Sequence, residues 1–365
     1  MSRFVYFLLI INMAANLIAS GPRILFAKSE DGAIITMIMA LFFGVFMNWA
    51  LINSFKAFPG KDLPQILSTY VSKWVSIPAL LVLGTIWYIA GLQTLITYID
   101  IMLRYLTPEM SIYIIIGMFV LTISFGVIMQ SRSILYILEL VLVMLLPGVV
   151  YYLLKLYFEK QLSWDQVTLA MSYIDNPPDY TIFSTVAFLF VGSFDIIIFN
   201  SLLKKKMVFG IKQALIVFFL GAFVIFTSYF IPIGMLGFEK IEAVLYPWLI
   251  TSDSIRMKFG IIERVIFIFL LIFLAIAFLN IILHWHVSFK LFENVFGVKN
   301  MSAGMKKNIG IGIMVVVFWT IAIFSTLKVT EYDLFLYSKY YFNTIPISFL
   351  GLMLLMWLVN RRAKL

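Results

Sequence analysis

The sequence contains no cysteine, and only 12% of its 365 residues are charged. Without cysteine it can form no disulfide, offer no thiol nucleophile and build no cysteine-ligated metal site. Soluble globular proteins carry about 25% charged residues, so half that share cannot coat a surface that faces water. The low charge therefore excludes an ordinary soluble protein and indicates that lipid is the solvent for much of the chain.

Catalytic motifs are also missing. No Walker-type phosphate loop, HExxH or GxSxG stretch occurs, so ATP hydrolysis and peptidase chemistry have no motif, and we predict neither an enzyme nor a cofactor. His284 and His286 have no Cys, Asp or Glu cluster beside them, so we expect an interfacial anchor rather than a metal site. The net charge of +9 comes from lysines and arginines that flank hydrophobic runs, as topology signals do. We therefore expect no nucleic-acid partner.

What the sequence does have is apolar residues, at 63% of the chain with a mean hydropathy of +1.03. A bilayer core about 30 Å thick needs roughly 20 such residues per helix, and lipid leaves only helices or a closed barrel as spanning structures. The runs are continuous rather than alternating, which selects helices. We predict an all-α integral membrane protein, a single transmembrane domain over residues 1–365 with about ten helices. The expected spans are 4–27, 32–55, 74–101, 110–129, 134–157, 182–203, 208–232, 262–286, 309–328 and 341–360.

The basic residues orient these spans. With a cytoplasmic N-terminus, about 16 of the 27 lysines and arginines fall on the inner side, as the positive-inside rule requires. Both termini are therefore predicted to be cytoplasmic. Two alternatives remain: residues 3–20 resemble a signal peptide, whose cleavage would leave nine spans, and Pro147 could divide the fifth run into two pieces.

Polar residues interrupt the first run at Asn12, Asn16, Ser20, Gly21 and Pro22. Proline removes a helical N–H donor and glycine adds backbone freedom, so this helix could be discontinuous. Many transporters hold a substrate carboxylate at the ends of such broken helices. The alternative is a kinked packing helix whose asparagine side chains bond to neighbouring helices.

The sixth run is interrupted by the sequence Gly192-Ser193-Phe194-Asp195. A carboxylate within a span invites a functional reading, and we expect local unwinding around a buried titratable group. The alternative is a close-packing notch of small residues, with Asp195 near an aqueous edge. Because runs one and six are five spans apart, their spacing suggests a 5+5 inverted repeat with a site between broken helices 1 and 6.

Glu139 carries the other notable charge within a run. It lies seven residues after Arg132, so the two share a helix face. We expect it to pair with a neighbouring helix, and a proton relay is the alternative.

Several short motifs, in this order along the chain, resemble the spore germination GerAB-type family, the permease-like B subunits of germinant receptors. They are Pro22-Arg23, Asp31-Gly32, Phe58-Pro59-Gly60-Lys61, Leu106-Thr107-Pro108-Glu109, Phe190-Val191-Gly192-Ser193-Phe194-Asp195, Tyr246-Pro247-Trp248, Glu263-Arg264 and Arg361-Arg362. Within these motifs, two positions depart from the family pattern: Ala33 replaces a tryptophan and Asp195 replaces a glutamate.

The resemblance implies the LeuT-like fold of the amino acid–polyamine–organocation transporter superfamily. It also implies a sensor in the spore inner membrane that works with A- and C-type germinant receptor subunits and binds a small nutrient germinant, usually an amino acid. By analogy the pocket lies between the breaks of helices one and six, completed by helices three and eight. The expected ligand-binding residues are Asn12, Ala15, Asn16, Ser20, Gly21, Tyr88, Gly192, Ser193, Phe194, Asp195 and Asn280.

One departure bears on the pocket. The family's Gly-x-Gly pair in helix one corresponds here to Ala15 and Leu17, and the leucine side chain would partly occlude the cavity. Two other functions therefore stay open. One is a proton-coupled amino acid transporter that uses Asp195 or Glu139, and the other is a structural or channel-forming subunit without a ligand.

Overall fold

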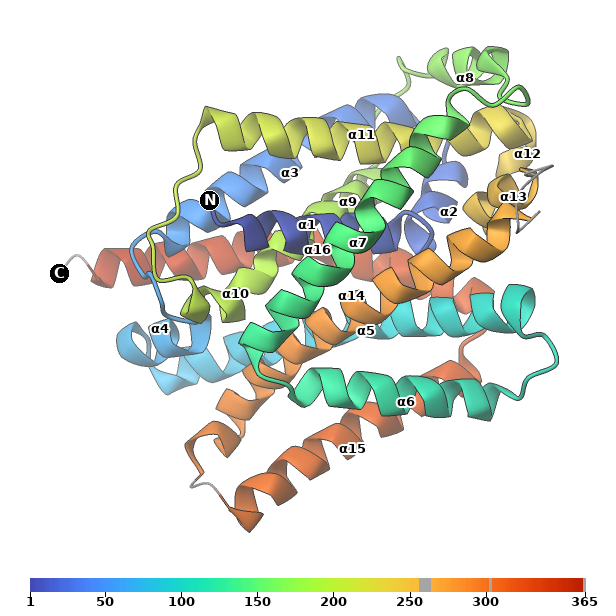
Figure 1. The fold of residues 1–365 in the computed structure, drawn as a ribbon. Helices are drawn as coiled ribbons and strands as arrows, with labels where there is room; N and C mark the ends of the chain where they lie inside the picture. Colours follow the sequence, from blue (N-terminus) through green and yellow to red (C-terminus); the bar gives the residue numbers. More distant parts are fainter. Residues whose placement is uncertain (256–263, 302–303, 364–365) are drawn as a thin grey trace.

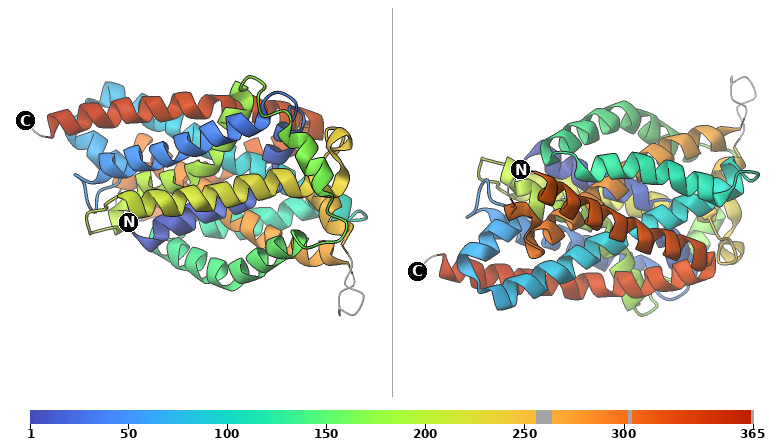
Figure 2. Two further views of the ribbon diagram at one scale, coloured as in Figure 1. Left: turned by 90° about the horizontal axis from the view of Figure 1, so that it is seen from above. Right: turned by 90° about the horizontal axis from the view of Figure 1, so that it is seen from below.

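The computed structural model describes residues 1–255, 264–301 and 304–363, and within these ranges every regular element is helical. Most long helices run side by side along one direction, and both termini lie at the same end of the bundle (Figures 1 and 2). The principal elements are α1 (Arg3–Asn16), α2 (Ser20–Phe26), α3 (Ala33–Phe55), α4 (Leu63–Tyr70), α5 (Lys73–Ile101), α6 (Ile112–Ile128), α7 (Ser131–Leu156), α8 (Trp164–Met171), α9 (Tyr180–Leu189), α10 (Ile196–Phe199), α11 (Ile211–Leu236), α12 (Phe238–Ile241), α13 (Pro247–Asp253), α14 (Val265–Val295), α15 (Met305–Lys328) and α16 (Glu331–Arg362).

Eight helices in the described ranges are long and apolar enough to cross a membrane, and the bent pair α1–α2 passes the same test as one span. Helix α6 is apolar but has 17 residues, the lower limit for a spanning helix. Each of the ten predicted runs thus coincides with a helix or a bent pair. The all-α membrane architecture is confirmed, whereas the inverted repeat and the single ten-span domain stay predictions.

Two helices extend well beyond their predicted runs, and the alternative division of the fifth run at Pro147 is wrong. Helix α14 continues nine residues past 286, because Phe289 and Leu291 beyond the polar turn are buried and Lys290 pairs with Glu293 at 2.7 Å. Helix α16 begins at Glu331 rather than 341, where Thr330 and Asp333 form a capping box. Helix α7 runs unbroken through Pro147. The predicted start at 262 and the motif residue Glu263 lie outside the described residues.

Helices α5 and α14 share the most extensive helix–helix interface of the described residues. An added Cβ at Gly91 would lie 2.3 Å from Cδ1 of Trp285, so only glycine lets this indole approach α5. The Trp285 Nε1 donates to the Tyr88 carbonyl at 3.0 Å, and the Ser288 hydroxyl donates to the Gly84 carbonyl at 2.7 Å. Close backbone approach and interhelical hydrogen bonds thus hold this pair together.

The two histidines of α14 do not face the lipid. His284 and His286 are both buried, so their prediction as an interfacial anchor is wrong. The two ring nitrogens of His286 each lie 2.8 Å from a partner, the Val127 carbonyl and the Ser131 hydroxyl, which ties α14 to the α6–α7 connection. Hydropathy predicted that the eighth span ends at His286, whereas α14 continues to Val295.

Glu139 of α7 pairs with Arg3 of α1, with 3.0 Å between Oε2 and the guanidinium. The prediction that Glu139 pairs with a neighbouring helix is therefore confirmed.

Ion pairs close the end of the bundle opposite the termini, where α8, α12 and α13 lie (Figure 1). Lys28 pairs with Asp179, which caps α9 by accepting from the amides of Thr181 and Ile182 at 2.7 and 3.0 Å. Burial raises the pKa of the Asp179 carboxyl, but the bonds from Lys28 and the two amides outweigh it and hold that pKa below its ordinary value. The hydrogen bond to Asp179 in turn raises the pKa of Lys28.

Gly32, which precedes α3 at this same end, has a φ of 63°, and a Cβ there would lie 2.3 Å from the Asn176 carbonyl. Glycine is required at this position both for its backbone conformation and for space.

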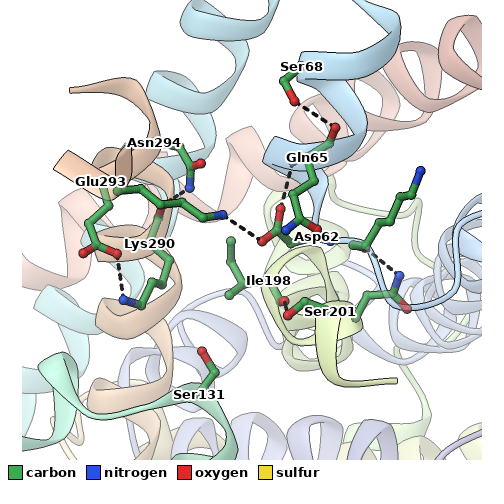
Figure 3. Close-up of polar contacts among 12 residues, drawn as sticks. Asp62, Gln65, Ser68, Ser131, Ile198, Ser201, Lys290, Glu293 and Asn294 are labelled. Atoms are coloured by element: carbon green, nitrogen blue, oxygen red, sulfur yellow. Dashed lines mark hydrogen bonds and ion pairs between the residues drawn. The ribbon is translucent and has the colours of Figure 1, made fainter. Parts of the chain in front are cut away.

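A polar cluster closes the end that carries the termini (Figure 3). Asp62 forms a capping box with Gln65 at the start of α4 and also reaches Lys299 at 3.3 Å. Asn200, which follows α10, donates to the carbonyls of Phe58 and Lys61, both at 2.8 Å. The loop before α4 is thus bound to the end of the sixth span and to the segment after α14.

Candidate functional site

The first span is broken where α1 meets α2. The two helices are inclined at 59°, and Leu17, Ile18 and Ala19 form the connection. The discontinuous helix is confirmed, but the break begins one turn before the predicted Gly21–Pro22 position. Pro22 lies instead in the first turn of α2, where its missing N–H removes no helical hydrogen bond.

Two asparagine amides hold α1 to the sixth span. Asn12 Nδ2 donates to the carbonyls of Phe188 and Leu189 at 2.8 and 3.1 Å, the last two residues of α9. Asn16 Nδ2 donates to the backbone and side-chain oxygens of Asn12 at 2.8 and 3.1 Å. In this conformation the asparagines bond to neighbouring groups, which was the alternative reading of this helix.

The sixth span tightens where unwinding was predicted. Residues Phe190–Asp195 form the 3-10 helix η2, and the span from Tyr180 to Leu202 passes as one helix. A Cβ at Gly192 would lie 2.2 Å from the Leu8 carbonyl oxygen and 2.5 Å from the Asn12 Cβ. Gly192 is therefore a close-packing notch against α1. The α-helix is interrupted at the predicted residues, but by a tighter 3-10 segment rather than by unwound chain.

Asp195 lies inside the bundle with 1% of its surface exposed, so its alternative placement near an aqueous edge is wrong. Trp87 Nε1 of α5 donates to its Oδ1 at 2.5 Å, and its Oδ2 has no hydrogen-bond partner among the described residues. A carboxylate buried in a membrane protein with one free oxygen is costly and is most often functional.

A small cavity lies at the break between α1 and α2. It has a volume of about 10 Å³, which is room for about one water, whereas ligand pockets measure about 300–1,000 Å³. It is lined by α1–α2, α9 and α11, among them Asn16, Leu17, Gly21, Thr185 and Ser228. The structure therefore presents this region closed.

A family model described as spore germination protein, of the spore permease type, matches residues 1–332. The chain belongs to this family. No curated protein matches the sequence. The match assigns the chain to multi-pass membrane proteins of spore germination, of a permease or receptor type rather than a known enzyme family.

Part of the predicted pocket of this spore germination protein is brought together. Asn12 and Gly192 touch where α1 packs on η2, and Asn16 and Gly21 line the cavity. Ser20 accepts a hydrogen bond from Ser338 of α16 at 3.0 Å. The remaining predicted residues of these two spans are buried beside them: Ala15, Ser193 and Phe194.

Tyr88 and Asn280 of the germination protein lie elsewhere. Tyr88 donates to the Phe318 carbonyl of α15 at 2.7 Å, and Asn280 Nδ2 lies 3.4 Å from the Thr94 hydroxyl of α5. Both bond between helices rather than at the break. The polarity of Tyr88 and Asn280 near the middle of their spans indicated that each needs a partner, but not which neighbouring helix each would face.

Sequence reasoning missed Thr185, Ser228 and Trp87. The two hydroxyl residues line the cavity, and their polarity inside apolar runs was a usable signal. No such signal marked Trp87, because an indole within an apolar run reads as ordinary packing until its partner Asp195 is known.

Proposed function

We propose that this protein is the germinant-sensing membrane subunit of a spore nutrient germinant receptor. It binds a small nutrient of the amino acid class and signals to A- and C-type subunits in the spore inner membrane, with both termini cytoplasmic. The observation that carries the proposal is the 59° break of the first span, whose residues border a closed cavity in a chain of the spore germination family.

The closed cavity bears on the mechanism. Since about 10 Å³ holds no amino acid, binding requires α1–α2 to move away from α9. That movement would release the Asn12 amide and the carbonyls of Phe188 and Leu189 for a ligand. A ligand shifts such an equilibrium only by its differential affinity for the open and closed states, which is what a sensor needs.

The outer loops offer a path for the signal. Arg23 of α2 donates to the Glu242 carbonyl beside α12, and Lys28 pairs with Asp179 at the start of α9. A displacement of α2 would therefore move the loops at that end, where partner subunits can contact the chain.

A second candidate function is proton-coupled amino acid transport. The observation that favours it is the buried carboxylate of Asp195, whose Oδ2 is unpartnered among the described residues. A carboxylate inside a span can serve as a proton site in a transporter.

The test compares Asn16→Leu with Asn48→Leu in spores that germinate through this receptor. Both asparagines are buried, and each donates to the carbonyl four residues earlier, at 2.8 Å for Asn16 and 2.9 Å for Asn48. Only Asn16 borders the cavity. Losing one buried polar contact should raise the half-maximal germinant concentration about tenfold for Asn16→Leu and leave Asn48→Leu unchanged.

The other functions give different results. An unchanged response in both variants would remove the pocket assignment and favour a structural subunit. Uptake of radiolabelled amino acid into reconstituted vesicles, lost in Asp195→Asn, would favour the transporter.

A further inference from the structure

A groove of about 650 Å³ runs between α5, the end of α14 and α15. Its floor includes Tyr88 and Phe318, and its walls are almost entirely apolar. Rim residues Ile313 and Val317 are 60% and 49% exposed. Because α15 lies at the edge of the bundle beside α6 (Figure 1), we take this rim to face the surrounding membrane.

Among the described residues the groove offers no free hydroxyl hydrogen to a polar ligand, because the two hydroxyls that line it already donate within the protein. Thr85 donates to the Leu81 carbonyl at 3.0 Å, and Tyr88 donates to the Phe318 carbonyl at 2.7 Å. Its volume falls in the range of ligand sites, but a nutrient amino acid would lose its hydration without compensation. The walls suit a hydrocarbon chain.

The inner mouth of the groove is basic. Gly310 lines the groove one helical turn after Lys306 and Lys307, which lie in the first turn of α15. Lys306 is exposed and Lys307 partly exposed. Val298, beside Lys299, lines the same end. The start of a 24-residue helix adds free N–H groups and the positive end of its dipole, which favour an anion.

We propose that this groove binds an anionic phospholipid, with an acyl chain against Tyr88 and Phe318 and the phosphate headgroup at Lys306 and Lys307. The apolar groove matches the acyl chain of such a lipid, and the basic residues at one end of the groove match its anionic headgroup. Anionic lipids are enriched in the leaflet that basic loops face. The lipid fills the space between α5 and α15 and links α15 to the α5–α14 pair.

Native mass spectrometry of the full-length protein in detergent tests the proposal, with phosphatidylglycerol and phosphatidylcholine of identical acyl chains as probes. The wild type should retain phosphatidylglycerol more tightly. Lys306→Gln with Lys307→Gln should weaken it roughly 30-fold, about fivefold per lysine, and leave phosphatidylcholine unchanged. The matched control is Lys204→Gln with Lys205→Gln, which removes two exposed charges after α10 and should change neither lipid.

Equal affinity for the two lipids in the wild type, or an equal loss in both double variants, would overturn the headgroup site. Ile313→Trp tests the chain site, because its exposed position accepts an indole that fills the groove. This variant should weaken both lipids. If it retains phosphatidylglycerol as the wild type does, the groove is not the lipid site and is open to another occupant, such as a partner's helix.

Discussion

Replacing Gly192 by alanine should separate the first and sixth spans. The added Cβ would lie 2.2 Å from the Leu8 carbonyl oxygen, and a backbone oxygen cannot rotate away as a flexible side chain can. Helix α1 or η2 must therefore shift, and the bonds from Asn12 to Phe188 and Leu189 must lengthen.

The expected cost follows from these contacts. Overpacking a well-packed site costs about 1–3 kcal/mol, and weakening two buried hydrogen bonds adds about 1–2 kcal/mol. Alanine has a higher helix propensity than glycine, which offsets up to about 1 kcal/mol of this destabilisation. The net destabilisation is then about 1–4 kcal/mol, which for a chain of this length lowers the melting temperature by roughly 1–5 °C.

The assay is thermal unfolding of the purified protein in detergent at one fixed scan rate, because membrane proteins often unfold irreversibly. Gly312→Ala in α15 is the matched control, since nothing lies within 4 Å of its added Cβ. It should melt at the wild-type temperature or slightly above. If Gly192→Ala melts together with Gly312→Ala, the notch between α1 and η2 has been misread.

Two further changes follow from single contacts. The pKa of Asp179 is lowered and the pKa of Lys28 is raised, so the stabilisation from their pair should hold between about pH 5 and 9 and fade as pH falls below about 4. Asp179→Asn should therefore lower the melting temperature across that window and match the wild type in acid. A constant difference in melting temperature at all pH values would contradict the assignment. Trp87→Phe removes the donor to Asp195 and should destabilise the protein by about 2 kcal/mol. If Trp87→Phe and Asp195→Asn both melt at the wild-type temperature, this hydrogen bond does not contribute to stability.

The broad architecture could be predicted from hydropathy, because each backbone N–H and C=O group in the lipid must be hydrogen-bonded within the protein. An apolar run of sufficient length must be helical, so the spans were predictable. A break in the first span was predictable too, although it lies one turn before the predicted Gly21–Pro22 position. The ends of α14 and α16 were missed because hydropathy stops at polar residues. The two local pairs that continue these helices, Lys290 with Glu293 and Thr330 with Asp333, are three residues apart and were usable signals in the sequence.

The candidate site was less predictable because its contacts join residues that are far apart in the chain. The sequence shows that a polar residue within a span needs a hydrogen-bond partner, but it does not show which residue that partner is. Asn12 and Gly192 meet because two helices pack there, whereas Tyr88 turns to α15 and Asn280 to α5. Small residues were the better guide, because a glycine that packs against a backbone can be replaced only at the cost of that contact.

The contact of Asn12 with the end of α9 also constrains biosynthesis. Its amide is satisfied by carbonyls 176 and 177 residues later in the chain. At a synthesis rate of about 5–20 residues per second, roughly 10–35 s pass before that partner exists. Until then the first span, broken at Leu17–Ala19, enters the bilayer with a polar amide that must be shielded by water or by the insertion machinery, so the first span cannot reach its final structure before the sixth has been made.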